Sequence, residues 1–363
     1  MNKLEQARQS INAIDKQMAD LFVQRMQAVR MVSEYKIEHG LPVLDATREE
    51  QVITRNSALV EDETMRSYYV NFLRNNMGLS RQYQQLLQQG LKVAYCGVEG
   101  AFAYIAARKI FDRAEKRAYA SFADAYHSVV KGECDCAVLP IENSYAGEVS
   151  QVVDLLFSGP LYVNGTYELE ITHNLLGLPD ATREDITTVI SHPQALAQCA
   201  DYIERNGFEA RSASNTAVAA KKLVETGDKT VAAIASRDTA ELYGLKVLES
   251  HINASSMNTT RFAVFSRVEE NSAGARDDQF ILVFTVRHEA GALAKAIQII
   301  GDCGFNMRTL RSRPMKELLW QYYFYVEADG NTKSPEGVRM MQELSQVCDK
   351  LRIVGRFSHQ TKL

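Results

Sequence analysis

Cations stand in line with apolar residues near the start of the chain. Residues 1–90 carry apolar side chains at helical spacing, and Arg25 and Lys36 fall within that stripe. Eleven residues at about 100° each bring Lys36 to within about 20° of Arg25 around a helix. Either cation could snorkel to the edge of a core, but two cations in register make that interpretation weaker than it is for one.

Further polar residues follow this stripe. Asp45 could cap a second helix, on which Arg48 and Glu49 would lie in the first turn, and Ser80 and Gln84 share one face of a third helix. Breaks at residues 39–42 and 57–62 predict three helices, the last over residues 64–89. So long a first helix, with an apolar stripe and no local partner, predicts that the segment dimerises.

These residues together resemble the active site of the all-helical chorismate mutases. The matching positions are Arg8, Arg25, Lys36, Asp45, Arg48, Glu49, Ser80 and Gln84. The resemblance implies a pericyclic rearrangement of chorismate to prephenate, which needs no nucleophile, metal or cofactor. It also implies that the three arginines bind carboxylates, with Arg8 supplied by a second subunit. Lys36 and Gln84 would face the ether oxygen, where negative charge develops, and Glu49 would hold the ring hydroxyl.

The spacing of the apolar residues changes at Lys92. Short apolar runs alternate with amphipathic stretches as far as about Val268, which predicts an α/β domain with two lobes and a substrate cleft between them. Ligands of open α/β sheets bind beyond the carboxyl ends of strands. The first such loop, GVEGAFA at residues 97–103, is neither GxGxxG nor a Walker motif, which argues against a nucleotide.

Four short motifs follow strand-like runs or close the segment: PIENS (140–144), SHPQ (191–194), NTA (215–217) and NTTRF (258–262). Helix capping alone would explain several of them, and a proline after His192 favours a turn. With YGL at residues 243–245 they resemble the prephenate dehydratase domain. This resemblance implies formation of phenylpyruvate without a cofactor, with Thr260 beside the departing hydroxyl and Arg261 near a carboxylate. The further candidates for binding and orientation are Glu142, Asn143, His192, Gln194, Thr216 and Phe262.

Some positions depart from that family's pattern. Val98 replaces a proline, and Ala101 and Ala103 stand where relatives often carry hydroxyls. Asn215 stands where a serine often precedes Thr216, although asparagine caps a helix equally well. An enzyme with an inactive dehydratase site is therefore one alternative.

The C-terminal segment, residues 279–363, follows a polar stretch, EENSAGARDD, that reads as a linker. Its βαββαβ order predicts an α+β ferredoxin-like fold. Gly291, Ala292 and Leu293, with Arg313 and Pro314, resemble the amino-acid-binding ACT domain, which implies phenylalanine as an effector near a helix N-terminus. Arg311 reverses the charge of a glutamate that is frequent in relatives. A domain that only dimerises is the alternative.

Composition limits the partners. The 363 residues carry 41 basic and 45 acidic side chains, which gives no electrostatic footprint for nucleic acid or a membrane surface. The charged N-terminus lacks the apolar core of a signal peptide, and no apolar run is long enough to span a bilayer. Six cysteines without CxxC spacing predict buried thiols rather than metal ligands or disulfides. We therefore expect a cytoplasmic protein that acts on small molecules.

The sequence as a whole predicts a multidomain protein. Residues 1–90 form the helical mutase domain, residues 91–270 a two-lobed domain like a periplasmic binding protein, and residues 279–363 the ACT domain. This order resembles the bifunctional chorismate mutase/prephenate dehydratase family, and we expect a homodimer or homotetramer. The rival is a ligand-responsive regulator with a helical DNA-binding module, but the near balance of charge in the first segment argues against it.

Overall fold

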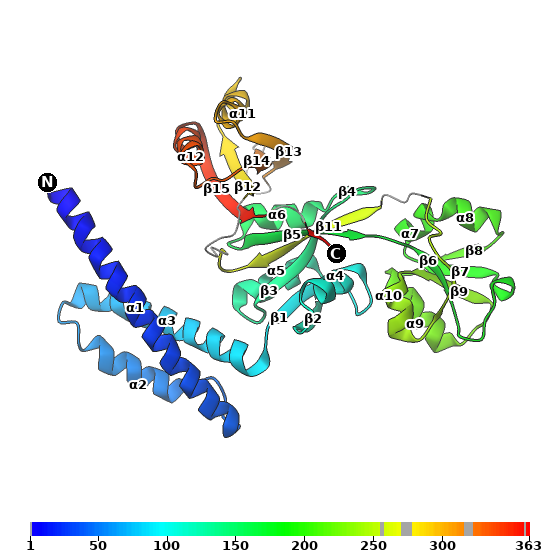
Figure 1. The fold of residues 1–363 in the computed structure, drawn as a ribbon, viewed down its shortest axis with the longest axis horizontal. Helices are drawn as coiled ribbons and strands as arrows, with labels where there is room; N and C mark the ends of the chain where they lie inside the picture. Colours follow the sequence, from blue (N-terminus) through cyan, green and yellow to red (C-terminus); the bar gives the residue numbers. More distant parts are fainter. Residues whose placement is uncertain (1, 255–257, 270–277, 316–321, 359–360) are drawn as a thin grey trace. The chain divides into compact units, whose positions relative to one another are not determined.

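The computed structural model describes residues 2–254, 258–269, 278–315, 322–358 and 361–363. It divides into two compact units, Met1–Leu91 and Lys92–Leu363 (Figure 1). Most of the polar stretch predicted as a linker lies outside the described residues. No helix within the described residues is both long and apolar enough to cross a membrane.

The first unit consists of three helices, as predicted: α1 (Lys3–Glu38), α2 (Ala46–Ser57) and α3 (Glu63–Gln89). Asn2 and Glu5 form a capping box at the start of α1, and Asp45 and Asp62 accept backbone N–H groups at the starts of α2 and α3. α3 packs against both other helices and buries Leu73 and Met77. This core is thin, because most of α1 is exposed.

The second unit is built on two sheets. Among the described residues, nine strands of an 11-stranded sheet have the order β13-β14-β12-β15-β5-β11-β3-β1-β2, and the other two are β16, which pairs with β5, and β4, which pairs with β3. A 5-stranded sheet has the order β10-β6-β9-β7-β8. The two-lobed α/β part occupies one half of the first sheet and all of the second (Figure 1).

The first lobe contains β1 (Lys92–Cys96), α4 (Phe102–Ile110), β2 (Glu115–Tyr119), α5 (Phe122–Lys131), β3 (Cys136–Asn143), β4 (Gly147–Glu148), α6 (Ser150–Ser158), β5 (Tyr162–Glu170) and β11 (Thr259–Ser266). The second lobe contains β6 (Asn174–Gly177), η1 (Arg183–Asp185), β7 (Thr188–Ser191), α7 (Pro193–Gln198), α8 (Ala200–Arg205), β8 (Glu209–Ser212), α9 (Thr216–Thr226), β9 (Val231–Ala235), α10 (Arg237–Tyr243) and β10 (Lys246–Glu249). The chain passes between the two sheets after β5 and returns before β11 (Figure 1).

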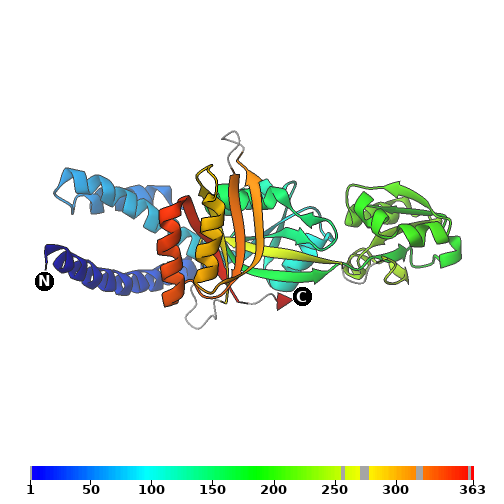
Figure 2. The same ribbon diagram turned by 90° about the horizontal axis from the view of Figure 1, so that it is seen from above.

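The C-terminal segment contains β12 (Gln279–Val286), α11 (Ala292–Asp302), β13 (Asn306–Pro314), β14 (Tyr322–Asp329), α12 (Pro335–Val347), β15 (Cys348–Phe357) and β16 (Thr361–Lys362). Its four long strands are antiparallel in the order β13-β14-β12-β15, which is the ferredoxin-like order that the sequence predicts. α11 and α12 lie side by side on one face of these strands (Figure 2).

The strand β12 is buried on both faces, and this ties the C-terminal segment to the first lobe. Phe280, Leu282 and Phe284 pack with the core under α11 and α12. Ile281 and Val283 point the other way and belong to the core of the first lobe. All six cysteines are free thiols. Four of them are buried, as the sequence predicts, but Cys96 and Cys348 are only partly buried.

Candidate active sites

Arg25 and Lys36 both turn toward the interior of the three-helix unit, as the periodicity predicts. Arg25 donates a hydrogen bond to the hydroxyl of Ser80 on α3. Burial lowers the pKa of Arg25. The Lys36 ammonium donates to the carbonyl oxygen of Val43 across 2.6 Å, which draws the end of α1 to the loop before α2. Two of the predicted cations therefore lie along the inner side of one helix.

Polar atoms without partners lie on α1 and α3. Gln84 is only 7% exposed, and Ser33 is fully buried, one turn before Lys36. Neither the Gln84 Oε1 nor the Ser33 Oγ has a hydrogen-bond partner in the structure. A buried polar atom without a partner costs stability, so each of these two atoms is a candidate contact for a polar ligand.

The predicted residues at the start of α2 differ in their burial and in their contacts. Asp45 caps the helix by accepting the N–H of Arg48 across 2.9 Å, and the Arg48 side chain is exposed. Glu49 forms an ion pair with Arg81, a residue that the sequence analysis missed. Arg81 follows Ser80 directly, so its position near the predicted mutase residues could have been inferred from the sequence.

Arg8 lies apart from the others. It is exposed on α1, 17 residues before Arg25, which is about 25 Å along the helix axis. An arginine side chain cannot cover that distance. Arg8 therefore cannot complete the site of its own chain.

The second unit has a cavity of about 600 Å³ lined by both lobes. The first lobe and the crossing segments contribute Asn143, Glu148, His173, Asn258, Thr260 and Phe262, and the second contributes His192, Gln194, Gln198, Asn215 and Thr216. The cleft predicted from the strand pattern is thus present. Ala101 and Ala103 also line it, so this wall of the cavity carries methyl groups.

Asn143 and Thr260 are opposite one another on neighbouring antiparallel strands. The Asn143 Nδ2 donates to the Thr260 Oγ1 across 2.9 Å, and the Asn143 Oδ1 accepts the backbone N–H groups of Tyr145 and Ala146 at 3.0 and 2.8 Å. Those backbone donors fix the orientation of the amide. Thr260 must therefore receive this bond, and its own hydroxyl hydrogen is free to point toward a ligand.

The remaining predicted residues of the cavity have structural roles as well. His192 caps α7 by accepting the N–H of Gln194 across 3.2 Å, and Asn215 caps α9 by accepting that of Val218 across 2.8 Å. Thr216 and Phe262 are buried. All of these except Val218 line the cavity.

The sequence analysis missed His173, Gln198 and Asn258, although Asn258 stood within a motif that it singled out. The Asn258 Nδ2 donates to the Gln198 Oε1 across 3.1 Å, and the His173 Nε2 lies 2.8 Å from the same oxygen. Asn258 in turn accepts from Asn143 across 2.9 Å. A continuous chain of side chains therefore joins Thr260 to His173. His173 lies between β5 and β6, directly before Asn174, and belongs to none of the motifs that the sequence analysis singled out.

Comparison with known families gives two matches that divide the chain as its geometry does. The chorismate mutase type II model matches residues 7–85, and the prephenate dehydratase model matches residues 93–270. The bifunctional chorismate mutase/prephenate dehydratase of Neisseria gonorrhoeae is 31% identical over 96% of this chain and 95% of its own length. The chain belongs to the bifunctional chorismate mutase/prephenate dehydratase family.

Solved structures match about three quarters of this bifunctional enzyme. The prephenate dehydratase of Arthrobacter aurescens in complex with L-Phe is 26% identical, has a TM-score of 0.68, and covers 74% of this chain and 90% of its own. GqqA, described as a novel type of quorum quenching acylase, is 30% identical with a TM-score of 0.68, and covers 73% of this chain and 97% of its own.

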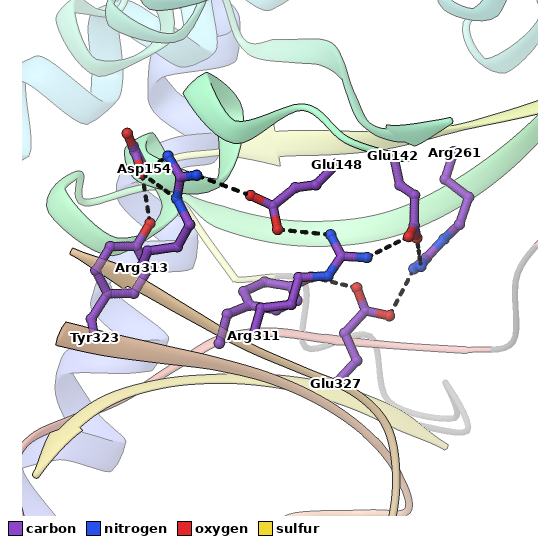
Figure 3. Close-up of polar contacts among 9 residues, drawn as sticks. Glu142, Glu148, Asp154, Arg261, Arg311, Arg313, Tyr323 and Glu327 are labelled. Atoms are coloured by element: carbon purple, nitrogen blue, oxygen red, sulfur yellow. Dashed lines mark hydrogen bonds and ion pairs between the residues drawn. The ribbon is translucent and has the colours of Figure 1, made fainter. Parts of the chain in front are cut away.

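Two predicted binding residues of the dehydratase part, Glu142 and Arg261, do not line the cavity. Arg261 lies between Thr260 and Phe262 on β11 but points to the opposite face of the strand. It pairs with Glu142 at 3.1 Å and with Glu327 of the C-terminal segment at 2.9 Å (Figure 3). Burial lowers the pKa of Arg261, but Glu327, Tyr325 and Glu142 together more than offset this and raise the pKa above its ordinary value.

Arg311 completes this cluster from β13. It pairs with Glu142 and with Glu148, the latter at 2.9 Å (Figure 3). Arg313 pairs with Asp154 at 2.9 Å, next to the hydroxyl of Tyr323. We call these residues the arginine–carboxylate cluster; its members are Glu142, Glu148, Asp154, Arg261, Arg311, Arg313, Tyr323 and Glu327. Arg311, which stands where relatives often have a glutamate, thus contacts the dehydratase part at Glu142, the residue before Asn143.

The predicted effector residues divide between two places. Leu293 lines a pocket of about 300 Å³ with Ser312 and Phe324, and Gly291, in the left-handed region at φ 83°, precedes α11 beside it. Arg313 belongs to the arginine–carboxylate cluster, and Pro314 lines a different pocket, against α6. Alternation along β13 separates Arg313 from Ser312, which point to opposite faces of the strand, whereas Pro314 is the last residue of β13.

The first loop of the dehydratase part holds the lobes together through its backbone. Thr239 Oγ1 donates to the carbonyl of Gly100 across 2.9 Å, and the Tyr243 hydroxyl donates to that of Glu99 across 3.1 Å. The alanines at positions 101 and 103 leave these contacts intact. The described residues contain no group of three or more His, Cys, Asp or Glu side chains that could hold a metal ion.

Proposed function

We propose that this enzyme converts chorismate to prephenate in its first unit and prephenate to phenylpyruvate in its second, with phenylalanine as the effector. The observation that carries the proposal is the Asn143–Thr260 hydrogen bond at the wall of the interlobe cavity. We assign residues 1–90 to the mutase, 91–270 to the dehydratase and 279–363 to the ACT domain.

For the mutase, Arg25, Arg48 and Arg8 of a second copy bind the substrate carboxylates. Lys36 and Gln84 stabilise the negative charge that develops on the ether oxygen in the transition state. Glu49 holds the ring hydroxyl, and Asp45 and Ser80 position the arginines. The inward position of Arg25 and the unpartnered Gln84 Oε1 support these assignments.

For the dehydratase, the Thr260 hydroxyl hydrogen-bonds the departing ring hydroxyl. The bond to the ring carboxylate breaks, carbon dioxide leaves, and its electron pair completes the aromatic ring as the hydroxyl leaves as hydroxide, which takes a proton from solvent and becomes water. Asn143 holds the Thr260 oxygen, and His192, Gln194, Thr216 and Phe262 form the cavity wall. Glu142 and Arg261 act from behind this wall, through the arginine–carboxylate cluster.

For regulation, phenylalanine binds beside Gly291, Ala292 and Leu293, where the N-terminus of α11 receives its carboxylate. Arg313 and Pro314 act at the contact with the dehydratase part rather than on the ligand. The arginine–carboxylate cluster joins the two parts.

We infer that a second copy covers α1. Its exposed apolar side chains include Leu4, Ile11, Ile14, Met18 and Leu21. This face and the position of Arg8 support a dimer or a higher assembly, because the mutase site lacks one cation without a second chain. The free thiols fit a reducing, cytoplasmic setting.

The test is to supply purified protein with chorismate and to follow chorismate, prephenate and phenylpyruvate separately, with and without phenylalanine. We expect phenylpyruvate to form, and to form more slowly when phenylalanine is added. Accumulating prephenate would contradict the dehydratase assignment. Unchanged chorismate would contradict the mutase assignment, and prephenate supplied directly would then test the dehydratase. If prephenate is also unchanged, the regulator is favoured, which salt-dependent DNA binding would test.

A further inference from the structure

The chain of hydrogen bonds between Thr260 and His173 has only one consistent direction. Asn143 presents its N–H groups because its oxygen is held by two backbone donors. Asn258 therefore accepts with its Oδ1 and donates with its Nδ2, and Gln198 must accept with its Oε1. The His173 Nε2, 2.8 Å from that oxygen, can then only be a donor.

This direction leaves the other nitrogen of His173 without a hydrogen when the ring is neutral. Burial lowers the pKa of His173, which favours the neutral ring, although the Gln198 bond acts in the opposite sense. The Nδ1 is buried and has no hydrogen-bond partner in the structure, and His173 is 2% exposed and lines the cavity. His173 thus offers an unused acceptor at the dehydratase site.

The chemistry of the substrate determines what such an acceptor can bind. Prephenate carries two ionised carboxylates, a ketone and one hydroxyl, so its single hydrogen-bond donor near neutral pH is the ring hydroxyl. We propose that the His173 Nδ1 accepts the hydrogen of that hydroxyl and so places the departing oxygen for Thr260. This inference rests on the proposed dehydratase function and adds a substrate-binding residue to it.

The position of His173 in the fold supports this role. It lies between β5 and β6, where the chain crosses between the lobes, and its backbone is held by Asn253 and Ile252 from the returning segment. Gln198 belongs to the second lobe, whereas Asn143 and Thr260 belong to the first. The lobes must therefore be correctly placed for the acceptor and Thr260 to meet one substrate.

Two substitutions separate the two nitrogens. In His173→Asn the amide oxygen can lie near the position of Nδ1, while the bond to Gln198 is lost. In His173→Gln the amide nitrogen can still donate to Gln198, while the acceptor at Nδ1 is lost. The readout is kcat and KM for supplied prephenate, with mutase turnover of the same protein as an internal control. His127→Gln, an exposed position on α5, is the matched control.

We expect His173→Gln to lose about 10- to 100-fold in kcat/KM and His173→Asn to retain clearly more. If His173 served only to hold Gln198, the order would be reversed. Equal losses in both variants, or a greater loss in His173→Asn, would overturn the inference. A wild-type protein that makes no phenylpyruvate would instead contradict the proposed function itself.

Discussion

The side-chain amide of Asn143 donates to the hydroxyl of Thr260 across 2.9 Å, from the end of β3 to the start of β11. The two residues are register partners on antiparallel strands, which brings them together, and the backbone N–H groups of Tyr145 and Ala146 orient the amide. The bond settles the direction of the Thr260 hydroxyl, whose hydrogen is left for the substrate.

Replacing Asn143 by aspartate tests this direction. The carboxylate of Asn143→Asp keeps an acceptor for the backbone N–H groups of Tyr145 and Ala146 but has no hydrogen for Thr260. The Thr260 hydroxyl would turn its hydrogen to the new carboxylate and away from the substrate. We expect dehydratase kcat to fall at least about 100-fold, with mutase turnover unchanged. A variant that keeps its dehydratase rate would show that the amide donor is dispensable.

Lys36 is the residue on which the mutase assignment depends most. We expect Lys36→Ala to lower mutase kcat about 10²- to 10³-fold, because it removes a preorganised cation from the ether oxygen. Lys16→Ala, on the exposed part of α1, is the matched control and should be close to wild type. Equal mutase rates in the two variants would refute the role of Lys36.

The pH profile of phenylpyruvate formation should show a loss of rate at acid pH. The acceptor role needs neutral His173, whose pKa burial holds below the ordinary value of 6.5. The dehydratase kcat/KM should therefore be flat near neutral pH and fall as the pH drops below about 6.5. His192, Glu148 and Cys96 are the other titratable groups that line the described cavity, and any limb of theirs would persist in His173→Asn. An unchanged limb in that variant would argue that another group titrates.

The arginine–carboxylate cluster should transmit the effector signal. Arg311→Ala removes the ion pairs to Glu142 and Glu148, whose side chains are 30% and 16% exposed. We expect the phenylalanine concentration for half-inhibition of the dehydratase to rise at least about fivefold. Arg308→Ala, on the same strand but paired with Asp329, should respond like wild type. Identical inhibition in both variants would exclude the cluster from the coupling.

Much of the fold could be predicted because the periodicity of apolar residues is a local property. Helical spacing predicts the three helices of the first unit, and the apolar runs that begin at residues 92, 136 and 279 each form a strand. The inward turn of Arg25 also followed from angular spacing alone. The division at residues 90, 270 and 279 stays a prediction, because β12 shares a core with the first lobe.

The parts that could not be predicted depend on contacts between distant residues. Arg261 was expected to meet a carboxylate of the substrate; it meets Glu142 and Glu327 instead, because the side chains of a strand alternate between its faces. His173 and Gln198 belong to no motif. They are joined to Thr260 only through Asn258, which lies 60 residues after Gln198. Sequence spacing carries no information about such a chain.

The most direct test of the account is dehydratase activity in Thr260→Ala beside Thr260→Ser. The serine variant keeps the hydroxyl and should retain kcat within about tenfold, whereas the alanine variant should lose at least about 10²-fold, with mutase turnover intact in both. Phenylpyruvate formed at the wild-type rate by Thr260→Ala would contradict the central claim that this hydroxyl assists the departure of the ring hydroxyl.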